Sequence, residues 1–308
     1  MLLAAISLLV GLCILVKAGD VFVEAAAQLA RSLNISSVII GAIVLGFGTS
    51  APELVVSTIA AARGNAALGV GNIVGSNVAN LSLVLGVAAL VTPIALSASV
   101  IRRQAPLSIA AVVAFALAVW DGELNRSDGI ILLVLLIVAM IVLIRTPDEV
   151  AISEATSEIS ITRSLLMSLL GLAGVLLGAQ LAVSGATKLA ESWGLSGGFI
   201  GFSLVALGTS LPELVTAVAA ARKNEAGLIV GNLFGSNLFN GLAGGAAMGL
   251  ANAGQIGDAK LTTGALLAML GAVIWAYARG ALKKRIGKAD ALMLLGIYIA
   301  SMVYLAAG

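Results

Sequence analysis

A six-residue motif that combines two hydroxyls, a proline and a glutamate occurs twice in the chain, each time inside a long apolar stretch. It reads Gly-Thr-Ser-Ala-Pro-Glu at residues 48–53 and Gly-Thr-Ser-Leu-Pro-Glu at residues 208–213. A carboxylate in such surroundings is energetically costly unless another group compensates its charge. The two copies therefore predict one ion site built from two halves, with one acid, Glu53 or Glu213, from each half.

The proline in each copy predicts a break in the helix that carries it. Pro52 and Pro212 have no N–H and clash with the preceding turn, so the helices should be interrupted around residues 48–52 and 208–212. A break frees main-chain carbonyl oxygens, which persist in hydrocarbon only where they line a cavity or are buried against protein. The motifs add the hydroxyls of Thr49, Ser50, Thr209 and Ser210. Carboxylate, carbonyl and hydroxyl oxygens are the ligands that hard cations such as Ca²⁺ or Na⁺ prefer.

A second motif, Gly-Asn-x-x-Gly-Ser-Asn, follows each glutamate at residues 71–77 and 231–237. Its polar side chains recur every four residues and so share one helical face: Asn72, Ser76 and Asn80 in the first copy, and Asn232, Ser236 and Asn240 in the second. The motif glycines, at 71, 75, 231 and 235, form an adjacent stripe that lets helices approach closely. Four helices, two from each half, are expected to surround one oxygen-lined site.

Structural roles compete with this interpretation. An isolated Thr-Ser-x-Pro is often only a kink whose hydroxyls bond back to the helix, and asparagine in a membrane helix often serves as a contact between helices. The duplication, with a buried acid in each copy, favours the ion site. For Asn77 and Asn237 the residues leave both roles open, support of an ion ligand or helix packing.

The composition places the chain among integral membrane proteins. Of its 308 residues, 60% are hydrophobic and 10% are charged, against roughly 25% charged in soluble domains. A net charge of +2 gives no reason to expect a nucleic-acid partner. Histidine is absent, which excludes a His-Glu-x-x-His metal site, so an intramembrane enzyme is not expected. The single cysteine, Cys13, permits no intrachain disulfide.

Ten apolar stretches are long enough to cross a bilayer, by the criterion of about 20 residues for a spanning helix. The first lacks the positively charged start of a secretory signal, so we interpret it as a retained helix. The expected spans are residues 2–30, 37–62, 66–91, 105–120, 129–144, 164–190, 197–221, 226–250, 261–278 and 291–307. The longest connection divides the chain into a first five-helix repeat (1–145), a linker (146–163) and a second five-helix repeat (164–308).

The two groups of five helices are related by sequence. A constant offset of 160 residues pairs the two glutamates, the two glycine-asparagine motifs, and Asn80 with Asn240. Because five is odd, a five-helix unit repeated in tandem enters the membrane in the opposite direction the second time. The predicted fold is an all-α membrane protein of ten transmembrane helices in two inverted repeats, with the second and seventh helices interrupted at the proline motif.

The basic residues predict the orientation. Cytoplasmic loops collect lysine and arginine, and the odd-numbered connections hold twelve such residues against four in the even-numbered ones. The odd connections, including the linker, are therefore expected in the cytoplasm, and both termini outside. We expect a multi-pass protein of the cell (inner) membrane.

These motifs resemble those of the calcium/cation antiporter superfamily, and the two copies with the ten-helix plan are similar to prokaryotic sodium/calcium exchangers over nearly the whole chain. The resemblance implies that Glu53 and Glu213 share Ca²⁺, helped by the main-chain carbonyls of Thr49 and Thr209. It implies Na⁺ sites that use the same acids with the side chains of Ser50, Ser76, Ser210 and Ser236 and the backbone of Gly46 and Ala206. Asn80 and Asn240 would lie at the centre of the site.

One residue departs from that family pattern. Sodium/calcium exchangers commonly carry aspartate at the position of Asn240, whereas both repeats here carry asparagine. The expected function is secondary active exchange of Ca²⁺ for Na⁺, with proton-coupled exchange of Ca²⁺ or another divalent cation as the alternative. Ca²⁺ and Na⁺ are then substrates bound at the site. No other cofactor and no protein partner is implied, and the surroundings are the lipid bilayer.

Overall fold

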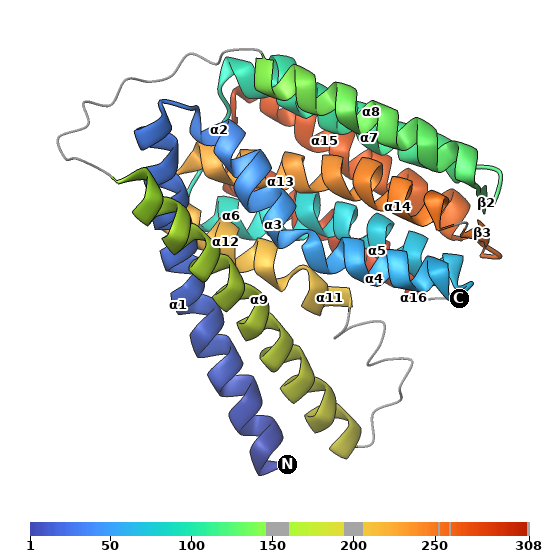
Figure 1. The fold of residues 1–308 in the computed structure, drawn as a ribbon, viewed down its shortest axis with the longest axis horizontal. Coiled ribbons are helices and arrows are strands. Elements are labelled where there is room, and N and C mark those ends of the chain that lie inside the picture. The colour runs from blue at the N-terminus through green and yellow to red at the C-terminus, as the bar shows by residue number, and fades with distance from the viewer. Residues whose placement is uncertain (146–159, 194–205, 252, 259, 307–308) are drawn as a thin grey trace.

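Helices that lie side by side make up most of the computed structural model, which describes residues 1–145, 160–193, 206–251, 253–258 and 260–306 (Figure 1). The first half contains α1 (Leu2–Leu33), α2 (Ser37–Ile40), η1 (Gly41–Gly46), α3 (Phe47–Thr49), α4 (Ala51–Ala62), α5 (Ala66–Ala79), η2 (Asn80–Val84), α6 (Leu85–Val91), η3 (Val100–Gln104), α7 (Ala105–Ala118) and α8 (Arg126–Arg145). The second half contains α9 (Ile161–Ser192), α11 (Ala206–Thr209), α12 (Leu211–Arg222), α13 (Ala226–Phe239), η5 (Asn240–Gly244), α14 (Gly245–Leu250), η6 (Leu261–Ala265), α15 (Leu266–Lys283) and α16 (Lys288–Ala306). The segments labelled η have the wider turns of a π-helix, and they continue directly into the neighbouring α-helices.

Around the repeated motifs, the elements of the two halves begin 160 residues apart. The starting pairs are Ala51 and Leu211 for α4 and α12, Ala66 and Ala226 for α5 and α13, and Asn80 and Asn240 for η2 and η5. The duplication inferred from the motifs is therefore matched by local structure. The opposite direction of the two halves in the membrane stays a prediction.

Six helical segments of the described residues are long and apolar enough to cross a membrane, or seven when the bent pair 37–62 is counted as one span. The six are Leu2–Leu33, Ala66–Val91, Val100–Ala118, Arg126–Arg145, Ile161–Ser192 and Leu261–Lys283. The prediction of ten spans stays a prediction. The expected span 197–221 begins outside the described residues, and the expected spans 226–250 and 291–307 are not among the segments that meet this criterion. Most of the predicted linker, residues 146–159, also lies outside them.

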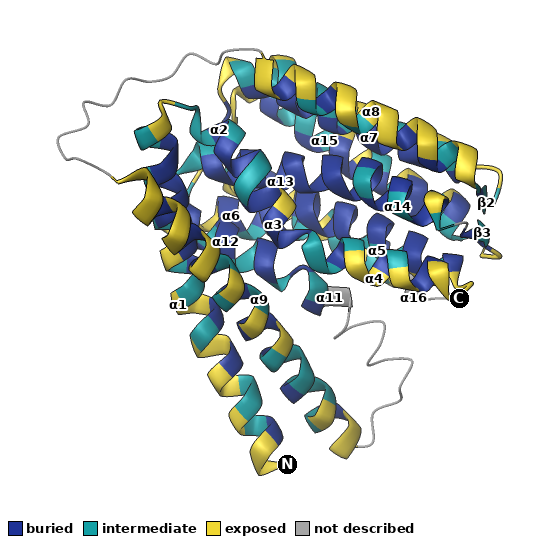
Figure 2. Cartoon of the chain, in the orientation of Figure 1, coloured by how far each residue is buried: buried dark blue, intermediate teal, exposed yellow. Residues whose placement is uncertain are grey.

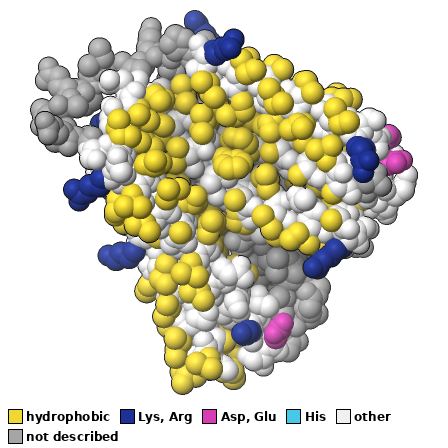
Figure 3. All heavy atoms as spheres, viewed as in Figure 1, with side chains coloured by type: hydrophobic (Ala, Val, Ile, Leu, Met, Phe, Trp, Pro, Cys, Tyr) yellow, Lys and Arg dark blue, Asp and Glu magenta, His cyan; other side chains and the backbone are white. Residues whose placement is uncertain are grey.

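Apolar side chains cover the outside of the bundle as well as its interior. Figure 2 shows exposed residues along α8 and along the lower ends of α1 and α9, whereas α13 is buried from Leu228 to Phe239. On the face seen in Figure 3, hydrophobic side chains spread over most of the surface and the charged ones lie near its edges. An apolar exterior of this kind suits contact with lipid tails, as expected for a membrane protein.

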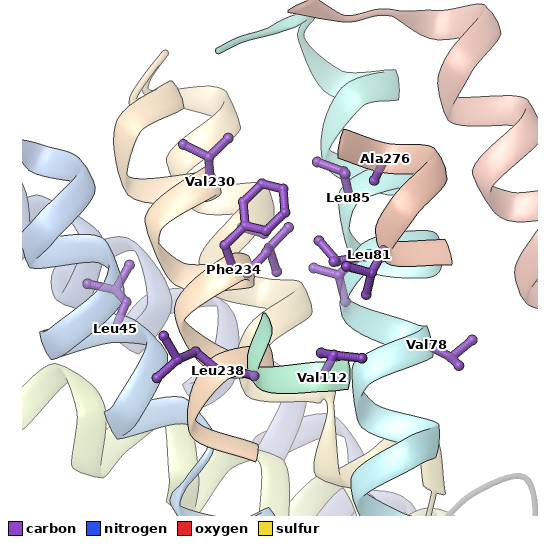
Figure 4. Packing of buried hydrophobic residues seen from close by; sticks show 14 of the residues in the cluster. Leu45, Val78, Leu81, Leu85, Val112, Val230, Phe234, Leu238 and Ala276 are labelled. Atoms are coloured by element: carbon purple, nitrogen blue, oxygen red, sulfur yellow. The ribbon is translucent and has the colours of Figure 1, made fainter. Parts of the chain in front are cut away.

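The core lies where α13 meets helices of the first half. Figure 4 shows Phe234 and Leu238 of α13 packed among buried residues from several other elements. The labelled members of this cluster are Leu45, Val78, Leu81, Leu85, Val112, Val230 and Ala276. Since α13 packs on η1, η2 and α7, the second copy of the Gly-Asn motif is held in the middle of the protein.

Helices α1 and α9 form a pair beside this core (Figure 1). They touch along their lengths through glycines, and a Cβ added at Gly178 would lie 2.6 Å from the main-chain nitrogen of Leu15. Their contacts with the rest of the protein are fewer, through α2, η1 and α12 for α1 and through α3, α11 and α12 for α9. The two helices are thus bound more extensively to each other than to the core.

Two short antiparallel strand pairs join the halves, an element that the all-α prediction omitted. β1 (Ile94–Ala95) pairs with β4 (Arg285–Ile286), and β2 (Glu123–Leu124) pairs with β3 (Gly254–Gln255). In register, Ile94 lies opposite Ile286 and Leu124 opposite Gly254. The pairing is reciprocal, because the earlier strand of each half pairs with the later strand of the other half. A two-fold relation between repeats produces this pattern.

Ion pairs connect the end of α1 with the connection between α12 and α13. Arg31 Nη1 lies 3.3 Å from Glu225 Oε1, and Lys223 Nζ lies 2.6 Å from Glu24 Oε2. All four side chains are partly exposed, so these pairs add little to stability. They mark which ends of the helices lie at the same surface.

Candidate ion-binding site

Both proline motifs interrupt their helices, as predicted. Between α3 and α4, Ser50 leaves the helical conformation with φ −83° and ψ 0°, and the axis bends by 45°. Ser210 does the same between α11 and α12, with φ −90° and ψ 4°. The proline that follows each serine lies in the first turn of the new helix, where its missing N–H costs nothing.

The two glutamates lie just inside these new helices and are buried, with 1% of Glu53 and none of Glu213 exposed. Each is in a first turn, where the helix dipole favours a negative charge. Ser76 donates to Glu53 Oε1 at 3.4 Å, and Ser50 donates to Glu213 Oε1 at 3.2 Å. The second carboxylate oxygen of each glutamate has no hydrogen-bond partner in the described part of the chain.

The halves exchange contacts at the acids. Ser50 of the first half donates to Glu213 of the second at 3.2 Å, and Ser236 of the second half donates to the Gly46 carbonyl of the first at 3.2 Å. Hydrogen bonds therefore join the two halves around the acids in both directions, from the first half to the second and from the second to the first.

Asn232 and Thr49 form a second link between the halves. Thr49 Oγ1 donates to the Leu45 carbonyl at 2.9 Å and lies 3.3 Å from Asn232 Oδ1. The amide nitrogen of Asn232 donates to Thr216 Oγ1 at 3.1 Å. Thr216, one turn after Glu213, was not predicted to take part in the site.

The equivalent asparagine of the first half bonds within that half. Asn72 donates to Ser57 Oγ at 2.9 Å and to the main-chain carbonyl of Glu53 at 3.2 Å. Ser57 was also missed by the sequence reasoning. The usable signal was a hydroxyl one helical turn beyond each glutamate, at Ser57 and Thr216, on the same face of the helix.

A serine and a carbonyl named by the family resemblance lie together. Ser236 Oγ donates to the Gly46 carbonyl at 3.2 Å. A side chain at Gly46 would press on α13, since a Cβ there would lie 3.0 Å from the Asn232 carbonyl. The corresponding residue of the second half, Ala206, is the first residue of α11, which packs on α5.

The central asparagines begin the π-helical segments η2 and η5 and are buried. Asn80 Nδ2 donates to Asn237 Oδ1 at 3.1 Å, and Asn237 Nδ2 donates to the Asn77 carbonyl at 3.1 Å. Neither amide atom of Asn240 has a partner among the described residues. The two central residues therefore differ in their contacts although they are identical in sequence.

Unpaired oxygens gather on the four helices α4, α5, α12 and α13 and their continuations. Buried oxygens without a hydrogen-bond partner in the described residues include Glu53 Oε2, Glu213 Oε2, Asn80 Oδ1, Asn240 Oδ1 and Ser210 Oγ. Buried polar atoms ordinarily have partners. Two carboxylates with neutral hydroxyl and amide oxygens form the ligand chemistry of a hard cation, Ca²⁺ or Na⁺.

Comparison with known proteins gives one family. The model of the sodium/calcium exchanger protein family matches residues 3–145 and 163–307. The inner membrane protein YrbG of Escherichia coli is 38% identical over 254 residues, which cover 78% of this chain and 77% of YrbG. The sodium/calcium exchanger MaX1 of Methanosarcina acetivorans is 30% identical over 275 residues, 76% of this chain and 79% of MaX1. A solved structure of the sodium-calcium exchanger NCX_Mj, soaked with Na⁺ and Sr²⁺, superposes with a TM-score of 0.88 at 30% identity and covers 98% of both chains.

Proposed function

Because the chain belongs to the sodium/calcium exchanger protein family, which is a family of transporters and not of enzymes, we propose that it is a secondary active antiporter exchanging Ca²⁺ for Na⁺ across the membrane. The observation that carries the proposal is the pair Glu53 and Glu213. Each comes from a different half, each is buried, and each keeps one carboxylate oxygen without a partner in the described residues. A cation is the partner that this arrangement lacks.

The side chains divide between two kinds of ion site in this proposal. Glu53 and Glu213 share Ca²⁺ with the main-chain carbonyls of Thr49 and Thr209. The Na⁺ sites use the same acids with Ser50, Ser76, Ser210 and Ser236 and the carbonyls of Gly46 and Ala206, and Asn80 and Asn240 complete the centre. The contacts of Ser76 with Glu53, of Ser50 with Glu213 and of Ser236 with Gly46 support this assignment.

Charge balance supplies the coupling. An empty site holds two carboxylates in a medium of low dielectric, which opposes its movement across the membrane. One Ca²⁺ or two Na⁺ cancel the two charges, and a third Na⁺ adds one charge and makes exchange sensitive to voltage. The protein can therefore switch the side of the membrane to which the site opens when ions are bound, whereas the empty protein does not make this change.

The moving part in this proposal is the pair α1 and α9. These helices correspond to the first and sixth expected spans, and they pack more on each other than on the remaining helices. Inverted-repeat transporters alternate access by moving one group of helices against another around a fixed site. The close contact of α9 with α1 at Gly178 supports movement of the two helices as one unit.

Contacts between connections support the ten-span topology. With the connections numbered in order, β1 with β4 links the third to the ninth, β2 with β3 links the fourth to the eighth, and Arg31 with Glu225 links the first to the seventh. Each contact therefore joins two odd-numbered connections or two even-numbered ones. Helices that cross alternately place all odd connections on one side, and the excess of basic residues assigns that side to the cytoplasm.

Proton-coupled exchange is the second candidate. It is favoured by asparagine at both central positions, Asn80 and Asn240, which leaves the charge of the centre to two glutamates. A proton neutralises a buried carboxylate as Na⁺ does. Uptake of Ca²⁺ driven by a pH gradient without Na⁺ would identify this coupling.

Ion flux in proteoliposomes tests the proposal. Purified protein is reconstituted, gradients of Na⁺, K⁺ and H⁺ are imposed one at a time, and uptake of radiolabelled Ca²⁺ is measured. We expect the Na⁺ gradient to drive uptake and both Glu53→Gln and Glu213→Gln to abolish it. Glu225→Gln, which changes an acid at the protein surface, is the matched control and should transport normally. Normal Na⁺-driven uptake by both site variants would refute the assignment.

A further inference from the structure

The orientation of the Asn80 amide is determined by two consecutive hydrogen bonds. The chain of bonds starts at the main-chain carbonyl of Asn77, which accepts from Asn237 Nδ2 at 3.1 Å. A carbonyl has no proton to donate, so Asn237 must turn its NH₂ group toward it. The other side of that amide, Asn237 Oδ1, then accepts from Asn80 Nδ2 at 3.1 Å.

These bonds leave the oxygen of Asn80 as the atom that faces away from Asn237. Asn80 is fully buried, and its Oδ1 has no hydrogen-bond partner in the described part of the chain. A side-chain amide presents a cation either with an oxygen, which is a ligand, or with an NH₂ group, which repels it. The orientation of this amide thus decides whether residue 80 is able to bind a cation.

We propose that Asn237 is a positioning residue of the ion site, which holds Asn80 with its carbonyl oxygen toward the transported cation. The inference rests on the proposed function, because it assumes a cation between the two halves. Asn237 does not touch the ion in this proposal. It acts through Asn80, and its own orientation is fixed by a main-chain atom of the first half.

The other half lacks the equivalent bonds. By the 160-residue offset, Asn77 corresponds to Asn237, but the Asn77 amide nitrogen lies 3.5 Å from Met269 Sδ and its Oδ1 has no partner among the described residues. Asn240, which corresponds to Asn80, has no partner for either amide atom there. The positioning role therefore belongs to one copy of the motif, and Asn77 and Asn237, which the sequence treats alike, have different roles.

Cation binding measured without transport tests the proposal. The thermal unfolding of purified protein is followed while CaCl₂ or NaCl is titrated, because an ion that binds the folded state raises Tm according to its Kd. We expect Asn237→Ala to raise the Kd for Ca²⁺ about tenfold, which corresponds to about 1.4 kcal/mol. Asn77→Ala keeps the main-chain carbonyl and should have a smaller effect. Ser82→Ala, which removes a buried hydroxyl bonded to Val78 one turn earlier, should leave the Kd unchanged.

A double-mutant cycle separates positioning from a general loss of structure. In an Asn80→Asp background both terminal atoms of residue 80 are oxygens, so no orientation has to be chosen. We expect Asn237→Ala to change the Kd by less than about threefold in that background. A wild-type Kd for Asn237→Ala, or the same tenfold loss in both backgrounds, would overturn the proposal.

Further variants keep the outcomes distinct. If Asn237→Ala does not fold, Asn237→Ser replaces it, because it also removes the side-chain amide and adds no charge; we expect the same rise in the Kd of about tenfold, and a wild-type Kd refutes the positioning role. If neither Ca²⁺ nor Na⁺ stabilises the wild type, the proposed function itself fails. If the wild type binds, Glu53→Gln does not, and Asn237→Ala binds normally, only the positioning role fails.

Discussion

Ser50 of the first proline motif donates a hydrogen bond to Glu213 of the second over 3.2 Å. The serine stands at the break between α3 and α4, where the bend turns its hydroxyl toward the opposite half. A substitution in one repeat is therefore expected to act on the acid of the other.

The hydroxyl of Ser50 should contribute measurably to ion affinity. Ser50→Ala removes a hydrogen bond to a charged group, a contact worth about 1.5–3 kcal/mol, and a proposed Na⁺ ligand. We expect half-saturation of Na⁺-driven Ca²⁺ uptake to require at least about tenfold more Na⁺. Thr58→Val is the control, because Thr58 bonds only to the Leu54 carbonyl of its own helix among the contacts described. Equal Na⁺ dependence of the two variants would show that Ser50 is not a ligand.

The close contact between Gly235 and η1 predicts strong sensitivity to a methyl group. A Cβ at Gly235 would lie 2.6 Å from the Cα atom of Ala42. This is a main-chain atom, which cannot move without the rest of its helix. Gly235→Ala should cost about 1–3 kcal/mol of stability, measured as a lower Tm in detergent. Gly271→Ala, where a Cβ meets no described atom within 4 Å, should leave Tm unchanged or raise it. A wild-type Tm for Gly235→Ala would mean that α13 and η1 are further apart.

Asn232 and Asn72 occupy the same motif position but should differ in importance. Asn232 is fully buried and joins Thr49 of the first half to Thr216 of the second, whereas Asn72 bonds within its own half. We expect Asn232→Leu to lower the free energy of unfolding by about 1–3 kcal/mol more than Asn72→Leu, because it removes hydrogen bonds at a fully buried position between the halves, whereas Asn72 is only half-buried. Thermal unfolding of both variants decides this, and equal losses would argue against a link between the halves.

The side of the membrane on which the strand pairs lie can be measured directly. In a Cys13→Ser background, Ser97→Cys lies next to β1 and Asp121→Cys next to β2, both at exposed positions. A thiol reagent that does not cross membranes should label intact cells at residue 121, and at residue 97 only after permeabilisation. Labelling of both variants from outside would contradict the alternating topology.

The local features of the site were predictable, and the relations between the halves were not. The breaks at Ser50 and Ser210 follow from the proline after each break, and the contact of Ser76 with Glu53 involves side chains that both motifs singled out. The different hydrogen-bond partners of Asn77 and Asn237 could not be predicted, because the two motif copies have the same residue at this position. The strand pairs could not be predicted either. Each strand has only two residues, too few to show an alternating pattern, and its partner lies far away in the sequence.

The distances along the chain between partners at the site bear on how the protein is made. Ser50 and Glu213 are 163 residues apart, Thr49 and Asn232 are 183 apart, and Ser236 and Gly46 are 190 apart. A ribosome delivers the first half to the bilayer well before these partners exist, and contacts of such separation form late in folding. Ser50 must therefore wait in the membrane for Glu213, and Glu53 has only Ser76 of its own half beside it. The site for ions is among the last parts of the molecule to assemble, and quality control of the unfinished chain has an intramembrane acid without a compensating charge to recognise.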